Sequence, residues 1–189
     1  MWRVIFVVVL ASALSLGIFA MVVQRGALLV RFDRRTGAMA FIWGAISLLM
    51  TLAGYGIGRL VLLGDIGKRD VFWVHVVCGI FLVLDGFRMF YRAFEKKTFI
   101  ERRMEKVDMR QESLLCLQFA VSSMMAGIVC GLLEIGMIKV ILSFFGLSTV
   151  SAVIGYFNGR ANGPAYSDRA YLAGGVILCA AGVWLQLAA

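Results

Sequence analysis

The chain consists of six long apolar runs separated by short polar segments. The runs are Val4–Val23, Met39–Leu63, Val71–Tyr91, Ser113–Leu133, Met137–Gly159 and Ala170–Ala188. A helix needs ~20 mostly apolar residues to cross the hydrocarbon core of a bilayer, and each run has about that length. The first run begins like a signal peptide but stays apolar to its end, which favours a retained helix. The pattern predicts an all-α integral membrane protein with six transmembrane helices.

The composition argues against a soluble domain. Hydrophobic residues make up 61% of the 189 residues, charged residues only 16%, and the mean hydropathy is +0.90. A soluble domain typically carries ~25% charged residues. The formal net charge is +8. In a membrane protein such an excess indicates basic cytoplasmic loops, and no aromatic-rich basic module suggests binding to nucleic acid.

The distribution of basic residues predicts the orientation. The loops after the first, third and fifth runs hold thirteen Lys and Arg residues, against five on the opposite side. Basic residues concentrate in cytoplasmic loops. We therefore expect a multi-pass protein of a bacterial inner membrane with both termini on the extracytoplasmic side.

The segment 92–112 joins the two halves of the chain. It carries seven basic and five acidic residues, with Ile100, Met104 and Val107 at helical spacing between them. This pattern predicts an amphipathic helix lying on the cytoplasmic face. Such a helix is a solvated connector or, alternatively, a regulatory site.

Two motifs recur in the same order in residues 1–91 and 113–189. They are Gly-Tyr-x-x-Gly-Arg, at Gly54–Arg59 and Gly155–Arg160, and a glycine pair seven residues apart, at Gly79/Gly86 and Gly175/Gly182. Three spans per half make the second half enter the membrane from the opposite side, which predicts two inverted three-helix repeats with a substrate site at their interface. The pairs Gly54/Gly58 and Gly155/Gly159 have the small-xxx-small spacing of close helix packing.

Several segments carry a resemblance to a known family along nearly the whole chain. They are Leu14–Ala20, Phe41–Ile46, Gly54–Gly58, Phe81–Met89, Val121–Leu132, Ser148–Gly155 and Leu172–Gly175. In them the sequence is similar to the MntP family of manganese efflux pumps, six-helix proteins with two inverted repeats that are related to LysE-type exporters. The resemblance implies a membrane exporter and a divalent cation as substrate.

Three intramembrane acids of that family are missing here. The corresponding positions, as the resemblance aligns them, are Gly17, Ser47 and Met124. Manganese prefers carboxylate, carbonyl and water oxygens, and hydroxyl groups supply no negative charge to offset a dication. We therefore expect manganese binding to be weak or absent, and the metal stays unassigned.

Polar side chains inside the spans gather in the first, second, fourth and fifth runs. The candidates for a substrate pathway are Ser12, Ser15, Ser47, Thr51, Gln118, Ser122, Ser123, Ser148, Thr149 and Asn158. Asp85 is the one acidic residue that lies well inside a predicted span. Arg88, three residues later, lies on the same helix face. We favour a structural ion pair between them over a proton-coupling site. The four cysteines lie in apolar runs and are interpreted as small hydrophobes.

The functional hypothesis is a secondary transporter that works by alternating access between its repeats. The alternative is a non-transporting partner subunit or scaffold with the same fold. Catalytic residues and cofactors are not expected, because the spans hold no paired acids, His/Glu cluster or Ser–Lys pair. The expected partners are the lipid bilayer and a divalent cation or small solute. A second copy of this chain or another membrane protein is a further candidate partner. A polar cavity between the first, second, fourth and fifth helices favours transport, and a solid core favours the scaffold.

Overall fold

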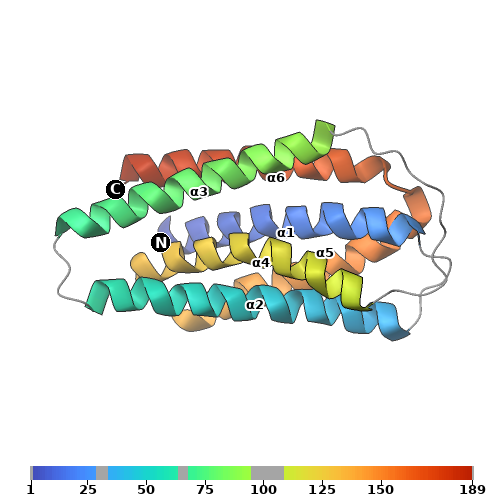
Figure 1. Ribbon diagram of the computed structural model, residues 1–189, viewed down its shortest axis with the longest axis horizontal. Coiled ribbons are helices and arrows are strands. Elements are labelled where there is room, and N and C mark those ends of the chain that lie inside the picture. Colours follow the sequence, from blue (N-terminus) through green and yellow to red (C-terminus); the bar gives the residue numbers. More distant parts are fainter. Residues whose placement is uncertain (1, 29–33, 64–67, 95–108, 189) are drawn as a thin grey trace.

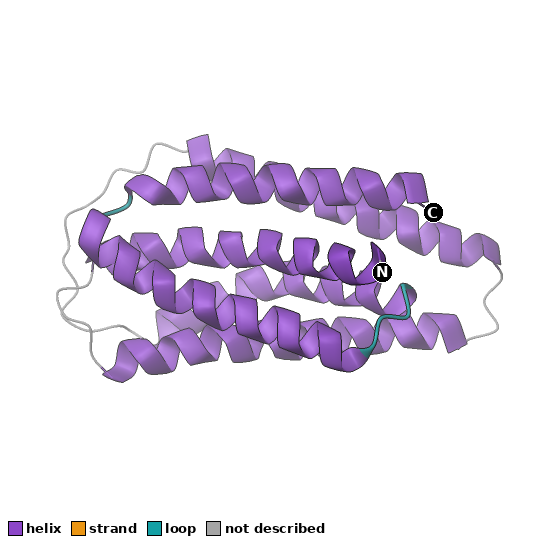
Figure 2. Ribbon diagram, turned by 180° about the vertical axis from the view of Figure 1, so that it is seen from behind, coloured by secondary structure: helices purple, strands orange, loops and turns teal. Residues whose placement is uncertain are grey.

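Six helices make up the described part of the chain. A computed structural model describes residues 2–28, 34–63, 68–94 and 109–188. The helices are α1 (Trp2–Leu28), α2 (Arg34–Leu63), α3 (Lys68–Phe94), α4 (Met109–Leu132), α5 (Met137–Asn162) and α6 (Ala165–Ala188). They lie along one common axis, with both chain ends at the same end of the bundle (Figure 1). Figure 2 shows helices and short loops in these residues, so the predicted all-helical architecture is confirmed for them.

Four of the helices have the length and apolar composition to cross a membrane. Their spans are Ile5–Leu28, Thr36–Leu63, Met137–Asn162 and Tyr166–Gln186, and α4 contains a shorter apolar stretch, Phe119–Leu132. Large apolar side chains such as Leu60, Ile138 and Leu142 are exposed on the bundle. An exposed apolar surface of this kind suits lipid rather than water. The protein is therefore a multi-pass membrane protein.

The predicted connector, residues 92–112, overlaps the ends of two helices. Helix α3 continues to Phe94 and α4 begins at Met109, so both helices extend into the segment 92–112. The three apolar residues that predicted an amphipathic helix lie between positions 95 and 108, outside the described residues.

The large helix interfaces connect the first half of the chain to the second. Helix α2 packs against α4, α1 against α5 and α3 against α6, while α2 and α5 meet in the centre of the bundle. Within the described residues, every extensive interface joins one of α1–α3 to one of α4–α6. The largest fully buried side chains include Trp43, Phe144, Tyr156 and Tyr171. The core therefore belongs to both halves jointly.

Glycines bring the backbones of paired helices into contact. A Cβ atom added at any of four glycines on α2 and α5 would press against the main chain of the facing helix. Small residues permit this approach, which helices in membranes use for packing. The contacts are Gly54 with Met124, Gly58 with Ile128, Gly155 with Phe19 and Gly159 with Val23.

A tight turn joins α4 to α5. Glu134 adopts a left-handed conformation with φ 54°, and the amide of Ile135 donates a hydrogen bond to the Cys130 carbonyl over 3.2 Å. The Tyr55 hydroxyl of α2 donates to the Ile135 carbonyl over 2.8 Å. Arg59, one helical turn further along α2, approaches the Glu134 carboxylate to 3.4 Å. These bonds fix the end of α2 to the hairpin.

Candidate functional site

Three serine hydroxyls meet in the centre of the bundle, and we call them the serine cluster. The Oγ atoms of Ser47 on α2 and Ser123 on α4 lie 3.1 Å apart, and Ser148 on α5 donates to Ser47 over 3.3 Å. All three side chains are buried. Buried hydroxyls need hydrogen-bond partners, and here they supply one another. The cluster is polar but carries no formal charge.

The other predicted pathway hydroxyls bond mostly within their own helices. Ser12 donates to the Val9 carbonyl, Ser15 to the Ser12 carbonyl and Thr51 to the Ser47 carbonyl, each over 2.8 Å. Such back-bonding is ordinary for hydroxyl residues inside helices. These hydroxyl groups therefore offer no free donors toward a solute.

The remaining predicted pathway residues are Asn158, Thr149 and Gln118. Asn158 accepts a hydrogen bond from the Asn162 side chain near the end of α5, about 15 Å along the helix from Ser148. Thr149 Oγ1 is buried without a hydrogen-bond partner among the described residues. Gln118 lies in α4, but its side chain is outside the described part of the structure.

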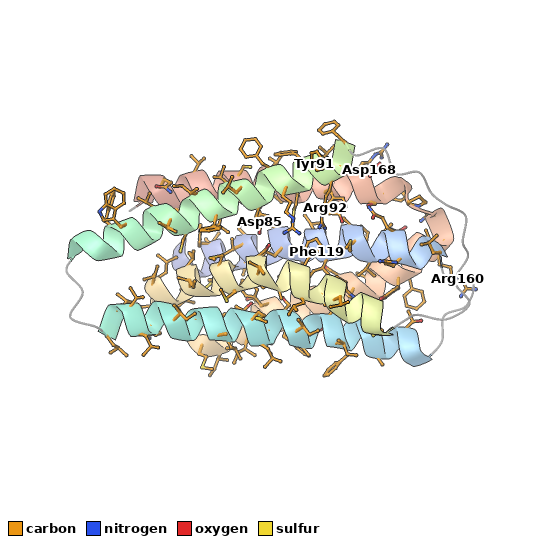
Figure 3. The ribbon with its side chains drawn as sticks, in the orientation of Figure 1. Asp85, Tyr91, Arg92, Phe119, Arg160 and Asp168 are labelled. Carbon is orange, nitrogen blue, oxygen red and sulfur yellow. The ribbon has the colours of Figure 1, made fainter. Side chains whose placement is uncertain are left out.

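A small cavity between α3 and α4 brings charged groups into the bundle, and we call it the arginine cavity. It has a volume of about 10 Å³, close to the space of one water molecule. Figure 3 shows Asp85, Arg92 and Phe119 turned toward one another between these helices. The cavity is lined by Asp85, Arg88, Met89, Arg92, Phe119 and Ser122.

The Asp85 carboxylate has two partners at this cavity. Its Oδ1 lies 4.0 Å from a guanidinium nitrogen of Arg88, the residue that the sequence paired with it. The Ser122 hydroxyl of α4 is within hydrogen-bonding reach of the same carboxylate. The Asp85 side chain is 19% exposed and that of Arg88 44% exposed. The distance of the ion pair is therefore long, and its Asp85 side is more buried than its Arg88 side.

Arg92 completes the arginine cavity and was not among the predicted site residues. Its guanidinium carbon lies 5.1 Å from the centroid of the Phe119 ring, a distance typical of a cation–π contact. The Arg92 side chain also lies near the hydroxyl of Tyr171, which is fully buried on α6 and donates to the Met21 sulfur. A spacing signal existed, because residues 85, 88 and 92 recur on one helix face.

The three positions aligned with family acids lie in different surroundings. Ser47 belongs to the serine cluster. Gly17 faces Met89 and Phe119, so it adjoins the wall of the arginine cavity. The main chain of Met124 packs against Gly54. Within the described residues, no group of three or more His, Cys, Asp or Glu side chains could hold a metal ion, and all four cysteines are free.

The architecture defines a multi-pass membrane protein with buried hydroxyl groups and partly buried charged groups between its helices. The family model described as "Putative manganese efflux pump" matches residues 33–186. The chain belongs to this family, as the resemblance in its sequence suggested.

Curated relatives with the name "Putative manganese efflux pump MntP" cover nearly the same length. The one from Neisseria gonorrhoeae is 25% identical over 94% of this chain and 92% of its own. The relative from Photorhabdus laumondii is 28% identical over 92% of this chain and 89% of its own. The relative from Alcanivorax borkumensis is 27% identical over 96% of both chains. No solved structure matches the chain.

Proposed function

We propose that this protein is a secondary exporter in which two inverted three-helix repeats expose a central site to each side of the membrane in turn. Membership of a family whose curated relatives are named as efflux pumps supports export in general. The reciprocal contacts between the two halves carry the rest of the proposal. In it the chain crosses the membrane six times, with both termini on the extracytoplasmic side.

The glycine contacts support a twofold relation between the halves. Three close contacts between α2 and α4 have counterparts between α5 and α1. Residue numbers shift by 101 from α2 to α5 and by 105 from α1 to α4. The matched contacts are Gly54–Met124 with Gly155–Phe19, Gly58–Ile128 with Gly159–Val23, and Gly131–Tyr55 with Gly26–Tyr156.

Helices α3 and α6 obey the same relation with a shift of 96. Gly86 approaches Gly175, and Gly79 approaches Gly182, so a half-turn exchanges the two contacts. Ser47 and Ser148, which differ by 101, bond to each other. A twofold axis would then pass between these two serines, through the serine cluster.

Unequal packing of two equivalent interfaces supports alternating access. Helix α1 packs extensively along α6, whereas its counterpart pair, α4 and α3, packs much less closely. The arginine cavity lies at this looser interface. In an inverted repeat, exchanging the two packings would open the opposite side, which is the motion that alternating access requires.

The central packing also keeps the alternative function open. Trp43 and Phe144 fill the core around the serine cluster with almost no exposure. A solid centre is what a non-transporting membrane subunit would have. By the criterion drawn from the sequence, this solid centre counts toward the subunit; membership of the family and the unequal packing of the α1–α6 and α3–α4 interfaces favour transport.

The side chains of the serine cluster and of the arginine cavity are poor ligands for manganese. The serine cluster is uncharged, and the arginine cavity holds two guanidinium groups against one carboxylate. A dication needs negative oxygen ligands. We infer that the solute is not free manganese, and that it is neutral or has its charge balanced within the cavity.

Manganese resistance in an exporter-deficient bacterium tests the proposal. The register of the glycine contacts pairs Gly17 with Ser122, whereas the sequence comparison paired it with Met124. Two acid-restored variants are therefore needed: Gly17→Asp with Ser47→Glu and either Met124→Asp or Ser122→Asp. The matched controls carry Asn and Gln at the same positions.

The expected result is rescue by an acid-restored variant and none by the unmodified chain or the amide controls. Full rescue by the unmodified chain would show that manganese is carried without these acids. Failure of both acid variants, at equal membrane levels, would favour the non-transporting subunit.

A further inference from the structure

An apolar groove runs between α1 and α6 at the end of the bundle that holds both chain termini. Its volume of about 490 Å³ lies within the ~300–1,000 Å³ range of pockets that hold small molecules. Phe6 and Ala181 are buried and form its floor, while Val9 on α1 and Trp184 on α6 are exposed and form its rim. The described side chains that line it are all aliphatic or aromatic, so the groove suits a hydrocarbon ligand.

Two adjacent alanines hollow the surface of α6 at this groove. Ala180 and Ala181 stand where the shift of 96 places Leu84 and Asp85 on α3. The cavity beside Asp85, at the α3–α4 interface, has a volume of only about 10 Å³. The groove therefore follows from the particular side chains of α1 and α6 and not from the repeated pattern of helices.

The position and length of the groove match one leaflet of a bilayer. Its lining on α6 runs from Val176 to Trp184, a rise of about 12 Å along the helix. The hydrocarbon layer of one leaflet is ~15 Å thick. The groove lies within the apolar spans Ile5–Leu28 and Tyr166–Gln186, so it opens onto lipid tails. Trp184 is 60% exposed near the end of α6, and tryptophan is the residue type enriched at the level of the headgroups.

We propose that this groove is a binding site for one acyl chain of a phospholipid, whose headgroup lies at the level of Trp184. A tail in the groove contacts side chains on both flanks and beneath it, whereas a tail on a convex helix surface contacts protein on one side. The additional dispersion contacts hold the tail, because within lipid an apolar surface gains nothing from leaving water. Binding there does not depend on the export proposed above.

The width of the groove argues against a helix of a second copy as its occupant. A volume of about 490 Å³ over a length of about 12 Å gives a cross-section of about 40 Å². A helix with its side chains is ~10 Å across, so its cross-section is roughly twice as large. A single extended chain is the occupant that this shape admits.

Phospholipid retained by the purified protein tests the proposal. The protein is extracted into detergent from vesicles of phosphatidylethanolamine and phosphatidylglycerol, and native mass spectrometry counts the lipids that stay bound. We expect one retained phospholipid per chain, and a severalfold smaller retained fraction for Ala180→Leu, whose side chain fills the groove. Ala173→Leu is the matched control, because Ala173 is an exposed alanine of the same helix outside the groove, and it should retain lipid as the unmodified protein does. Ala180→Val replaces Ala180→Leu if that variant does not fold.

A phospholipid with a photoreactive diazirine in its tail locates the retained molecule. Peptides that contain Phe6 or Ala180 should be labelled severalfold more than the exposed face of α5 around Leu142 and Val150, and Ala180→Leu should remove this difference. Equal labelling of the two faces, or retention that Ala180→Leu leaves unchanged, would overturn the proposal. A dimer that shields the groove from the label would also overturn it and assign the groove to a second copy. Retention that requires one of the two headgroups would overturn the assignment to an acyl chain.

Discussion

Glycine positions within one helix turn of each other differ in what surrounds them. On α2, a Cβ at Gly58 would lie 2.5 Å from the Ile128 carbonyl oxygen and close to the backbone of Gly131. A Cβ at Gly56, two residues earlier, would meet nothing within 4 Å. Main chain cannot yield as a flexible side chain can, so the two glycines should respond differently to the same substitution.

The prediction is that Gly58→Ala destabilises the protein by ~1–3 kcal/mol because it forces α2 and α4 apart. Gly56→Ala should be neutral or stabilising by up to ~1 kcal/mol, since alanine favours the helix. Thermal unfolding of both variants in the same detergent measures this. Equal destabilisation by the two would mean that α2 and α4 do not meet at Gly58.

At the scale of elements, the hairpin between α4 and α5 holds a residue in an unfavourable conformation. Glu134 has φ 54°, which costs an ordinary residue more than it costs glycine. Its ion pair with Arg59 is exposed on both sides, so it contributes little in return. Hydrogen bonds of the turn and of Tyr55, rather than this side chain, keep the hairpin in place.

We predict that Glu134→Gly is neutral or stabilises by up to ~1 kcal/mol, whereas Glu134→Val destabilises by ~1–2 kcal/mol. Valine removes the same charge but cannot adopt positive φ without strain. The two unfolding midpoints, compared directly, isolate the backbone effect. Equal losses in the two variants would mean that the ion pair, which both remove, holds the turn rather than the backbone conformation.

The elements themselves could be predicted from apolar runs, but their contacts could not. The six apolar runs correspond to the six helices, and the interruption between the fourth and fifth runs coincides with the turn between α4 and α5. Helix ends were placed a few residues short because charged residues continue the helical backbone beyond the apolar part, as at Lys68 and Arg92. Helix spacing paired Asp85 with Arg88. Tyr171, on another helix, could not be linked to Arg92 by any local spacing.

For the whole molecule, the testable property is which end of the bundle faces the cytoplasm. Arg160 lies at the end of the bundle opposite both termini (Figures 1 and 3). With the native cysteines removed, we predict that Arg160→Cys is labelled by a membrane-impermeant thiol reagent only after the cytoplasmic side is exposed. Glu134→Cys should be labelled in intact cells. Reversed labelling would invert the proposed topology, and labelling of both in intact cells would rule it out.

The large interfaces join helices of the first half of the chain to helices of the second half, and this has a consequence for biosynthesis. Helix α1 finds its extensive partners in α5 and α6, and α2 finds its own in α4 and α5. A ribosome makes these helices in order, so α1 must wait in the bilayer until more than a hundred further residues have been inserted. In the proposed six-span topology, insertion and assembly are then separate stages, with each helix stable alone in lipid before it meets its partner. A truncated chain that ends after α3 would therefore reach the membrane but stay unassembled. Its exposed glycine-lined faces would be available to bind a second chain.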